Sequence, residues 1–111
     1  MTFFQGSLFI ETPLFTKQIQ ELVDDDRYRT LQLSLIFRPD AGDIIRDSGG
    51  LRKIRLAIPG RGKRGGLRII YYWDKPADRI YMLLAYKKSK QADLTQEQIK
   101  FLRKLVKEWL E

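Results

Sequence analysis

Three basic residues on two strand-like runs are the side chains best placed to act together. Lys53 and Arg55 lie two positions apart within the run from Leu51 to Ile58, so a strand would turn both toward one face. In the next run, residues 67–73, Arg68 alternates with apolar side chains and can share that face. Like charges that face each other across strands are destabilising, so their convergence predicts a bound anion. If the strands pair in another register, the three side chains instead splay into water.

The chemistry open to such a cluster is restricted by the residues that the chain lacks. It contains no His and no Cys, which excludes thiolate nucleophiles, zinc sites built on Cys and the commonest general base. RNA supplies its own nucleophile, the 2′-hydroxyl, so a cleavage site needs only a proton acceptor, a group that stabilises the phosphate charge and a proton donor. Lysine, arginine and tyrosine can fill these roles without a metal or another cofactor. The predicted catalytic residues are Lys53, Arg55, Arg68 and Lys87.

Positive charge is concentrated in the middle of the chain. Residues 51–90 hold 12 basic and 2 acidic side chains, whereas residues 1–50 hold 5 basic and 8 acidic ones and residues 91–111 hold 4 of each. Such a block favours a polyanionic partner, most simply nucleic acid, because each neutralised phosphate releases counterions. The alternative is a solvated basic surface, although surface charge is normally mixed in sign.

Three helices are predicted from apolar spacing and cap residues. Thr12 suits the cap of a first helix, with Pro13 at its first position. A second helix has the acidic triplet Asp24–Asp26 as its N-terminal turn and must end before Pro39, because the residue before a proline is pushed out of the helical region. The last helix begins at Thr95–Gln98, which forms a capping box.

Four strands are predicted, with an irregular connection over residues 40–50, which are rich in turn residues. Alternation and flanking turn residues place the strands at residues 7–11, 51–58, 67–73 and 79–86. The order strand, two helices, three strands, helix describes an α+β fold with a mainly antiparallel four-stranded sheet, helices on one face and an open basic face. Residues 1–111 are predicted to form this single domain, as a monomer, with Trp73 and Trp109 packed inside it.

A soluble, cytoplasmic protein with no membrane partner is expected. No apolar run approaches the roughly 20 residues of a membrane helix. The first residues also lack the basic start and the small-residue cleavage site of a signal peptide.

Further basic residues flank the predicted strands. The loop at residues 60–66 carries basic side chains among glycines, but it joins antiparallel strands and is therefore no P-loop, which needs a helix directly after its glycines. A basic hairpin that grips a phosphate backbone is the functional interpretation, and a flexible tip without a role is the alternative. The predicted residues for binding RNA or the ribosome are Arg52, Arg61, Lys63, Arg64, Tyr86, Lys88 and Lys90.

Several of these segments occur in the same order in a known superfamily. Residues 50–55 read GLRKIR, residues 60–72 read GRGKRGGLRIIYY, and Tyr86-Lys87-Lys88 and Asp93-Leu94-Thr95 follow. In this order and spacing the chain resembles the HigB branch of the RelE/ParE toxin superfamily, from the first strand through the last helix. The resemblance implies the β-α-α-β-β-β-α fold of that superfamily.

The resemblance also implies a function. Such proteins are toxins of bacterial type II toxin–antitoxin systems that enter the A site of the 30S ribosomal subunit, where they meet mRNA and ribosomal RNA and cut the translated message. A cognate antitoxin, here HigA-like, neutralises the toxin. RelE-like toxins use basic residues of the second and third strands, which here fall on Lys53, Arg55 and Arg68. Relatives place an arginine, a tyrosine or histidines after the last strand, where this chain has Tyr86 and three lysines, so the general acid is not assigned.

Two other functions fit parts of the pattern. ParE-like members of the superfamily share the fold, lack the basic nuclease residues and poison DNA gyrase. A nucleic-acid-binding module without chemistry would need the basic block alone, and would not need Arg68 to face Lys53. The presence of Lys53, Arg55 and Arg68 favours RNA cleavage. If Arg68 stands exposed on an open sheet face, its replacement by Ala should abolish cleavage with little loss of stability.

Overall fold

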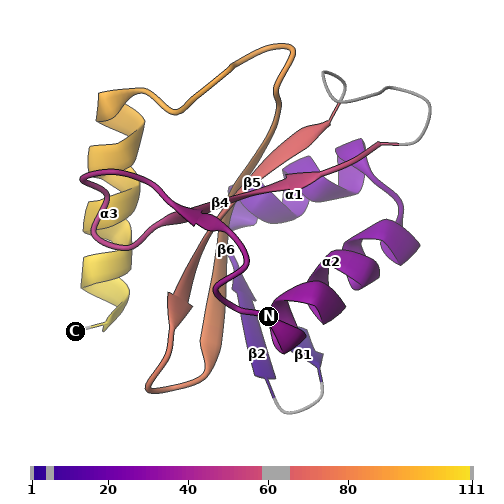
Figure 1. Ribbon diagram of the computed structural model, residues 1–111, viewed down its shortest axis with the longest axis horizontal. Helices are drawn as coiled ribbons and strands as arrows, with labels where there is room; N and C mark the ends of the chain where they lie inside the picture. Colours follow the sequence, from indigo (N-terminus) through magenta and orange to yellow (C-terminus); the bar gives the residue numbers. More distant parts are fainter. Residues whose placement is uncertain (1, 5–6, 59–65, 111) are drawn as a thin grey trace.

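A six-stranded mixed sheet forms the centre of the α+β fold (Figure 1). The computed structural model describes residues 2–4, 7–58 and 66–110. The strand order is β1-β2-β6-β5-β4-β3, in which β2 and β6 are parallel and the other neighbours are antiparallel. The elements are β1 (Thr2–Phe4), β2 (Ser7–Glu11), α1 (Pro13–Leu22), α2 (Asp25–Phe37), β3 (Asp43–Ile44), β4 (Arg52–Leu56), β5 (Leu67–Asp74), β6 (Arg79–Lys87) and α3 (Gln96–Leu110). No helix in the described ranges is long and apolar enough to cross a membrane.

The helices begin at the cap residues that predict them. The Thr12 hydroxyl accepts a hydrogen bond at 2.9 Å, and the Asp24 carboxylate one at 2.8 Å, from the backbone N–H three residues further on. In the capping box, the Thr95 hydroxyl accepts from the Gln98 N–H at 3.0 Å, and the Gln98 side chain accepts from the Thr95 N–H at 2.9 Å. These bonds satisfy N–H groups that the first turn of a helix leaves without partners. All three predicted helix starts are confirmed.

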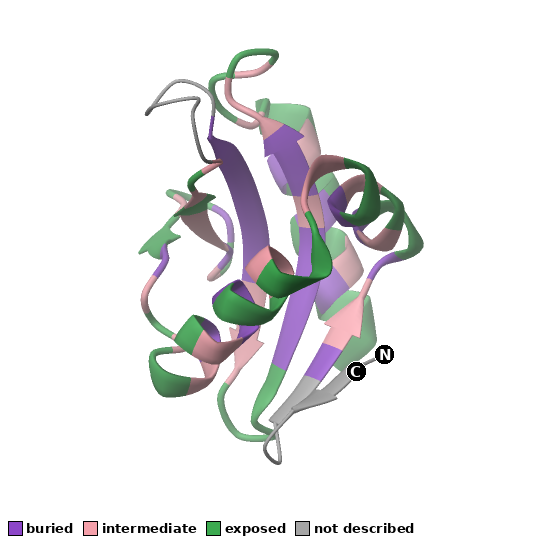
Figure 2. Ribbon diagram, turned by 90° about the vertical axis from the view of Figure 1, so that its right-hand side faces the viewer, coloured by how far each residue is buried: buried purple, intermediate pink, exposed green. Residues whose placement is uncertain are grey.

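Helices cover both faces of the sheet, which corrects the prediction that they lie on one face. α1 and α2 enclose one core through residues such as Phe15 and Leu35. α3 packs on the opposite face, where Leu102 and Val106 belong to the same hydrophobic core as Ile70. Figure 1 shows α3 apart from α1 and α2, and Figure 2 shows the buried strands between the helices. The second face is basic at one end of the sheet and apolar in the middle. Its basic residues led to the prediction of an open face, although the apolar part binds α3.

Two short strands extend the sheet beyond the predicted four. β1 pairs with β2, and the two residues of β3, Asp43 and Ile44, pair with Lys53 and Arg52 of β4. The connection expected to be irregular over residues 40–50 therefore contains a strand. A strand of two residues has no periodicity that a sequence could show, because the neighbouring strand creates the pairing.

Tyr71 and Arg52 fix the turn that precedes β3. The Tyr71 hydroxyl donates to the Pro39 carbonyl at 2.7 Å and accepts from the Gly42 N–H at 2.8 Å. Arg52 Nη1 donates to the carbonyls of Asp40 at 3.1 Å and Gly42 at 2.8 Å. This packing leaves no room for a side chain at Gly42, where a Cβ would lie 2.7 Å from Cε1 of Tyr71.

Replacing Gly42 by Ala is expected to lower the free energy of unfolding by about 1–3 kcal/mol, because the new methyl group must displace Tyr71 from its hydrogen bonds. Urea denaturation measures the change. Asp43→Ala, at the exposed next position, is the control and should alter stability by no more than about 0.5 kcal/mol. If Gly42→Ala is as stable as the wild type, Tyr71 does not hold this turn in the way described.

Candidate functional site

The cations expected to converge do share one sheet face, at the end of the sheet where β4 and β6 end and β5 begins. Arg55 lies opposite Arg68 in the β4–β5 pairing, and Arg68 lies opposite Tyr86 in the β5–β6 pairing. Lys53 stands two residues before Arg55 on the same face, opposite Ile70. Directly opposed residues of a ladder project to the same side. Lys53, Arg55, Arg68 and Tyr86 are termed the cross-strand row below.

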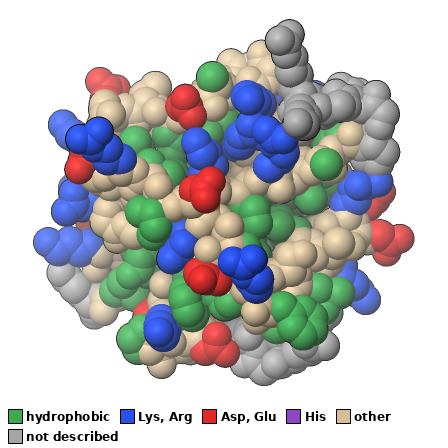
Figure 3. Space-filling model, viewed as in Figure 1, with side chains coloured by type: hydrophobic (Ala, Val, Ile, Leu, Met, Phe, Trp, Pro, Cys, Tyr) green, Lys and Arg blue, Asp and Glu red, His purple; other side chains and the backbone are tan. Residues whose placement is uncertain are grey.

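α3 shares this sheet face with the cross-strand row. The residues against which it packs include Ile70, which lies opposite Lys53, and Tyr81 and Leu83, which lie further from the strand ends that carry the row. The Tyr86 ring joins this apolar cluster. In Figure 3, Lys and Arg side chains gather in the upper part of the molecular surface seen in that view, with single acidic side chains among them. The face thus combines an apolar surface that holds α3 with a cationic surface beside it.

Arg68 is buried, which corrects the expectation of an exposed cation. Its exposed fraction is 7%. It lies on β5, which has β4 on one side and β6 on the other, so neighbouring strands flank it on both sides. Its Nη1 atom has no hydrogen-bond partner in the part of the chain that the structure describes. Burying a guanidinium donor without a partner is costly, and such a donor binds an anion strongly when one is supplied.

Tyr86 places a second buried donor next to Arg68. Its hydroxyl also has no hydrogen-bond partner among the described residues. Burial raises the pKa of Tyr86, the nearby Asp93 carboxylate raises it further, and the Arg68 guanidinium lowers it in part. The hydroxyl therefore keeps its proton at neutral pH and can donate it or form a hydrogen bond.

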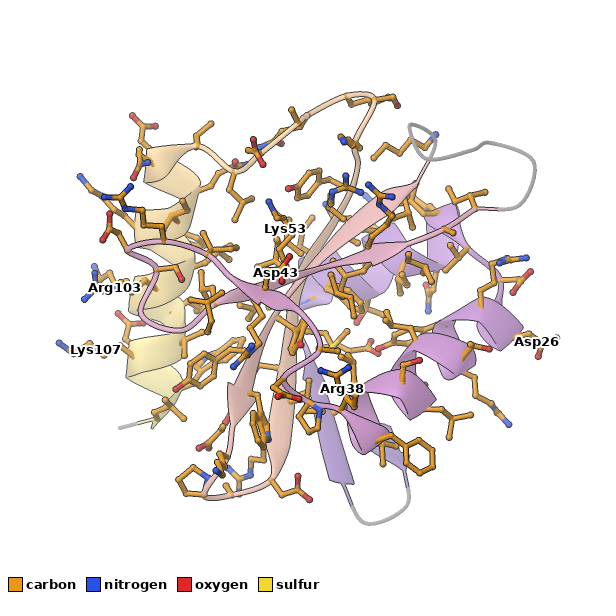
Figure 4. All side chains as sticks on the ribbon, in the orientation of Figure 1. Asp26, Arg38, Asp43, Lys53, Arg103 and Lys107 are labelled. Carbon is orange, nitrogen blue, oxygen red and sulfur yellow. The ribbon has the colours of Figure 1, made fainter. Side chains whose placement is uncertain are left out.

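Lys53 forms an ion pair with a residue to which the sequence analysis gave no role. Its Nζ donates to Oδ1 of Asp93 at 3.2 Å. Figure 4 shows Lys53 on β4 close to Asp43, its neighbour on β3, while Asp93 belongs to the segment between β6 and α3. In the sequence, Asp93 stands out in one way: it is the one acidic residue from residue 79 to residue 96, and it follows a group of lysines. No group of three or more carboxylates in the described ranges could hold a metal ion.

A β-bulge turns Lys87 away from the cross-strand row. The β5–β6 register shifts between Ile70 and Tyr71, so that Leu83 is an extra residue in β6. Simple alternation from Leu83 onward would put Lys87 on the face of Arg68. The bulge reverses the side of the sheet to which each later residue of β6 projects. Lys87 therefore lies opposite Leu67, on the side of α1 and α2. The structure therefore does not bring Lys87 together with the other predicted catalytic residues.

The remaining predicted binding residues differ in their position relative to the row, and three of them lie outside the described ranges. Lys90 lines a hollow beside α1 together with Lys87, Glu21 and Tyr86, which is a member of the row. Arg52 is held by the carbonyls of the turn before β3 and projects to the opposite face from Lys53. Lys88 follows β6 directly, where its N–H donates to the Gly66 carbonyl at 3.2 Å. The residues Arg61, Lys63 and Arg64 lie outside the described residues.

Trp73 packs within the fold, as the sequence predicts, whereas Trp109 is 37% exposed and only one side of its ring is covered. Trp73 lies against the core that α1 and α2 enclose. Trp109 of α3 stacks on Tyr81, with 5.2 Å between the ring centroids. Neither ring belongs to the cross-strand row.

Comparisons with known proteins point to one toxin family. The family model described as the RelE toxin of the RelE/RelB toxin–antitoxin system matches residues 36–111, which include the whole cross-strand row. A mutant of the E. coli toxin RelE in the free state has a similar structure, with 14% sequence identity over 78% of this chain and 87% of that chain and a TM-score of 0.56. A chain of the intact E. coli RelBE toxin–antitoxin complex is also similar, with 15% identity over 73% of this chain and 95% of that chain and a TM-score of 0.57. At these identities the two structures establish a shared fold.

Proposed function

The chain belongs to the RelE toxin family, and we propose that it inhibits translation by cleaving translated mRNA in the A site of the ribosome. The observation that carries the proposal is a pair of buried donors in the cross-strand row. Arg68 Nη1 and the Tyr86 hydroxyl have no partners in the described structure, and their residues lie directly opposite each other on β5 and β6. A phosphate group of RNA that reaches both would satisfy both, which compensates for the cost of burying them.

Each member of the row is assigned one role in cleavage by the 2′-hydroxyl. Lys53 acts in its neutral amine form, after it has released its own proton to solvent: the amine accepts the proton of the 2′-hydroxyl, whose oxygen attacks the adjacent phosphorus. Arg55 and Arg68 stabilise the charge that develops on the phosphate oxygens. Tyr86 donates its proton to the 5′-oxygen as the bond from phosphorus to that oxygen breaks. The products are a 2′,3′-cyclic phosphate and a free 5′-hydroxyl.

Dependence on the ribosome follows from the residue types in this site. Ordinary lysine and tyrosine side chains have pKa values of about 10, far from the neutral range in which general acid and base catalysis is most efficient. Such a site gains most when the substrate is already held in a reactive geometry, which can supply roughly 7–11 kcal/mol of the barrier. A ribosome that fixes one codon of mRNA can supply this positioning.

The proposed function implies two partners in the bacterial cytoplasm. The ribosome meets the basic end of the sheet, where Lys88 is assigned a contact with the RNA backbone. The same role is assigned from the sequence alone to Arg61, Lys63 and Arg64. A cognate antitoxin of the HigA type is the second partner, by analogy with the toxin–antitoxin complex of E. coli RelBE. It can act by covering the row or by adding bulk that blocks entry to the A site.

Lys87→Ala is expected to cleave programmed ribosomes at a rate within about threefold of the wild type, because its charge lies on the other side of the sheet and is screened from the row. The measurement is the single-turnover cleavage rate. Lys53→Ala is the matched comparison and should lose activity strongly. A loss of more than about 100-fold in Lys87→Ala, of the size expected for a catalytic group, would return Lys87 to the catalytic set.

The proposed function is tested by mapping new RNA ends. A defined mRNA is incubated with the purified protein, with and without translating ribosomes, and a parallel reaction follows supercoiling by DNA gyrase. The proposal requires cuts within the message that appear only when ribosomes translate it. Inhibited supercoiling without any RNA cuts would assign the protein to gyrase poisons. Binding to RNA with neither effect would leave a module without chemistry.

A further inference from the structure

Asp93 places one carboxylate among the cations of the cross-strand row. Its Oδ1 lies 3.2 Å from Lys53 Nζ. The side chain of Asp93 is 75% exposed and that of Lys53 is 35% exposed. The carboxylate is also near enough to the Tyr86 hydroxyl to act on it electrostatically. Asp93 thus faces two of the groups to which the proposed function gives contact with RNA.

The backbone around Asp93 is held so that this carboxylate faces the row. Gln91 Nε2 donates to the Asp93 carbonyl at 2.9 Å and to Gln98 Oε1 at 2.5 Å. Gln98 in turn caps α3 through Thr95. The position of the main chain is therefore set by the start of α3. The exposed side chain can still turn away from Lys53 by rotation about its own bonds.

The ion pair with Asp93 is specific, because a second acidic residue stands nearby without pairing. Asp43 lies opposite Lys53 in the β3–β4 ladder. Within the described residues, however, the ion pair of Lys53 is with Asp93. Exposed ion pairs of this kind contribute little to stability, so opening this one costs the fold little.

We propose that Asp93 is an internal competitor of the RNA phosphate. A carboxylate and a phosphate diester are both anionic oxygen acceptors, and both suit the ammonium group of Lys53. In the free protein the Asp93 carboxylate is paired with Lys53, and its negative charge repels RNA that is not bound to a ribosome. When a message held in the A site reaches the row, its phosphate replaces the carboxylate. The inference rests on the proposed function, since it concerns the same site, and it makes Asp93 a residue that selects ribosome-bound RNA over free RNA.

The test measures the binding of free RNA in the absence of ribosomes. The probe is a short fluorescent single-stranded RNA with 2′-deoxy substitutions that prevent cleavage, followed by fluorescence anisotropy at low salt. Asp93→Asn should bind it about three- to tenfold more tightly than the wild type, because one repulsive charge is removed at short range. Asp93→Glu keeps the charge and should remain close to the wild type. In the Lys53→Gln background the gain from Asp93→Asn should shrink.

Asp47→Asn is the matched control for net charge. Asp47 pairs with Arg46 on an exposed turn, and its positive φ of 60° is tolerated by Asn. This variant should change RNA affinity by less than about twofold, since the Asp47 carboxylate pairs with Arg46 and not with a member of the row. The proposal is overturned if Asp93→Asn binds no more tightly than the wild type, or if Asp47→Asn gains as much.

A second readout separates this inference from the proposed function. Asp93→Asn should keep ribosome-dependent cleavage, because the carboxylate only competes with the substrate. Loss of cleavage in this variant would overturn the inference and make Asp93 a participant in the reaction. The binding assay uses neither ribosomes nor turnover. If the wild-type protein fails to cleave mRNA, the result of the binding assay still stands. If Asp93→Asn fails to bind RNA more tightly, the result of the cleavage assay still stands.

Discussion

Replacing Arg68 by Met is expected to reduce ribosome-dependent cleavage by at least about 10²–10³-fold, the effect of removing one preorganised donor from a site that stabilises developing charge. Met fills much of the same volume without the charge. The measurement is the single-turnover rate of cleavage on ribosomes that carry a defined message. Arg68→Lys keeps a positive charge but loses the planar fork that contacts two phosphate oxygens, so its rate should lie between those of Arg68→Met and the wild type.

The same variant should fold as well as the wild type or better. Arg68 is buried, lies opposite the like charge of Arg55 and has an Nη1 atom without a partner in the described structure. Its removal should therefore leave the free energy of unfolding unchanged or raise it by about 1 kcal/mol, as when buried charges are replaced by apolar groups of similar volume. Wild-type cleavage, or destabilisation by more than about 2 kcal/mol, would show that Arg68 serves the fold rather than the reaction.

Tyr86→Phe is expected to lower the cleavage rate by about 10²–10⁴-fold, because it removes the proposed proton donor while the ring stays in place. Stability should be unchanged or slightly higher, since the lost hydroxyl is buried without a hydrogen-bond partner among the described residues. The single-turnover rate and urea denaturation measure the two effects. Tyr72→Phe, on the same sheet face but outside the row, is the control and should keep its activity. Full activity in Tyr86→Phe would remove Tyr86 from the proton-donor role.

The raised pKa of Tyr86 adds a pH dependence to this comparison. The folded state holds the proton of the Tyr86 hydroxyl more tightly than the unfolded state does. The resulting contribution to the free energy of unfolding is complete below the ordinary tyrosine pKa of about 10, and it is lost as the pH rises through the raised pKa of the folded state. The wild type should therefore lose stability above pH 10 relative to Tyr86→Phe, which has no group to titrate at this position. Equal loss in both proteins would contradict the burial of this hydroxyl.

Local features of the fold are predictable from the sequence because short-range chemistry determines them. Thr12, Asp24 and Thr95 satisfy the first N–H groups of the three helices, and each helix begins where its cap predicts. Alternation along β4 and β5 likewise places Arg55 and Arg68 on one face, because a strand allows no other arrangement unless it contains a bulge. That part of the candidate site is predicted from spacing alone.

The features that the sequence does not reveal depend on residues far apart in the chain. The extra residue in β6 at Leu83 reverses the faces beyond it and moves Lys87 away from Arg68. Nothing in the order of the residues marks that position, since Leu83 and Leu84 are the same residue type. The burial of Arg68 follows from its two neighbouring strands, and the face that α3 covers is apolar only in part.

Asp93 shows the same limit within the site. As an acidic residue just before a capping box it looks like an ordinary turn residue, and its role depends on its distance from Lys53, which precedes it by 40 positions. Only the folding of the segment after β6 back over β4 brings the two together. Sequence reasoning can identify the cations of such a site more easily than the anion that pairs with them.

The central claim is that the cross-strand row cleaves ribosome-bound mRNA through the 2′-hydroxyl of the message. The most direct test compares two messages on programmed ribosomes, one of RNA throughout and one with a single 2′-deoxynucleotide at the mapped cut position. Attack by the 2′-hydroxyl cuts the first message to give a 2′,3′-cyclic phosphate and a 5′-hydroxyl, and leaves the second message uncut at that position. Cleavage of the deoxy-substituted message at the same position, or products that carry a 3′-hydroxyl and a 5′-phosphate, would contradict that claim.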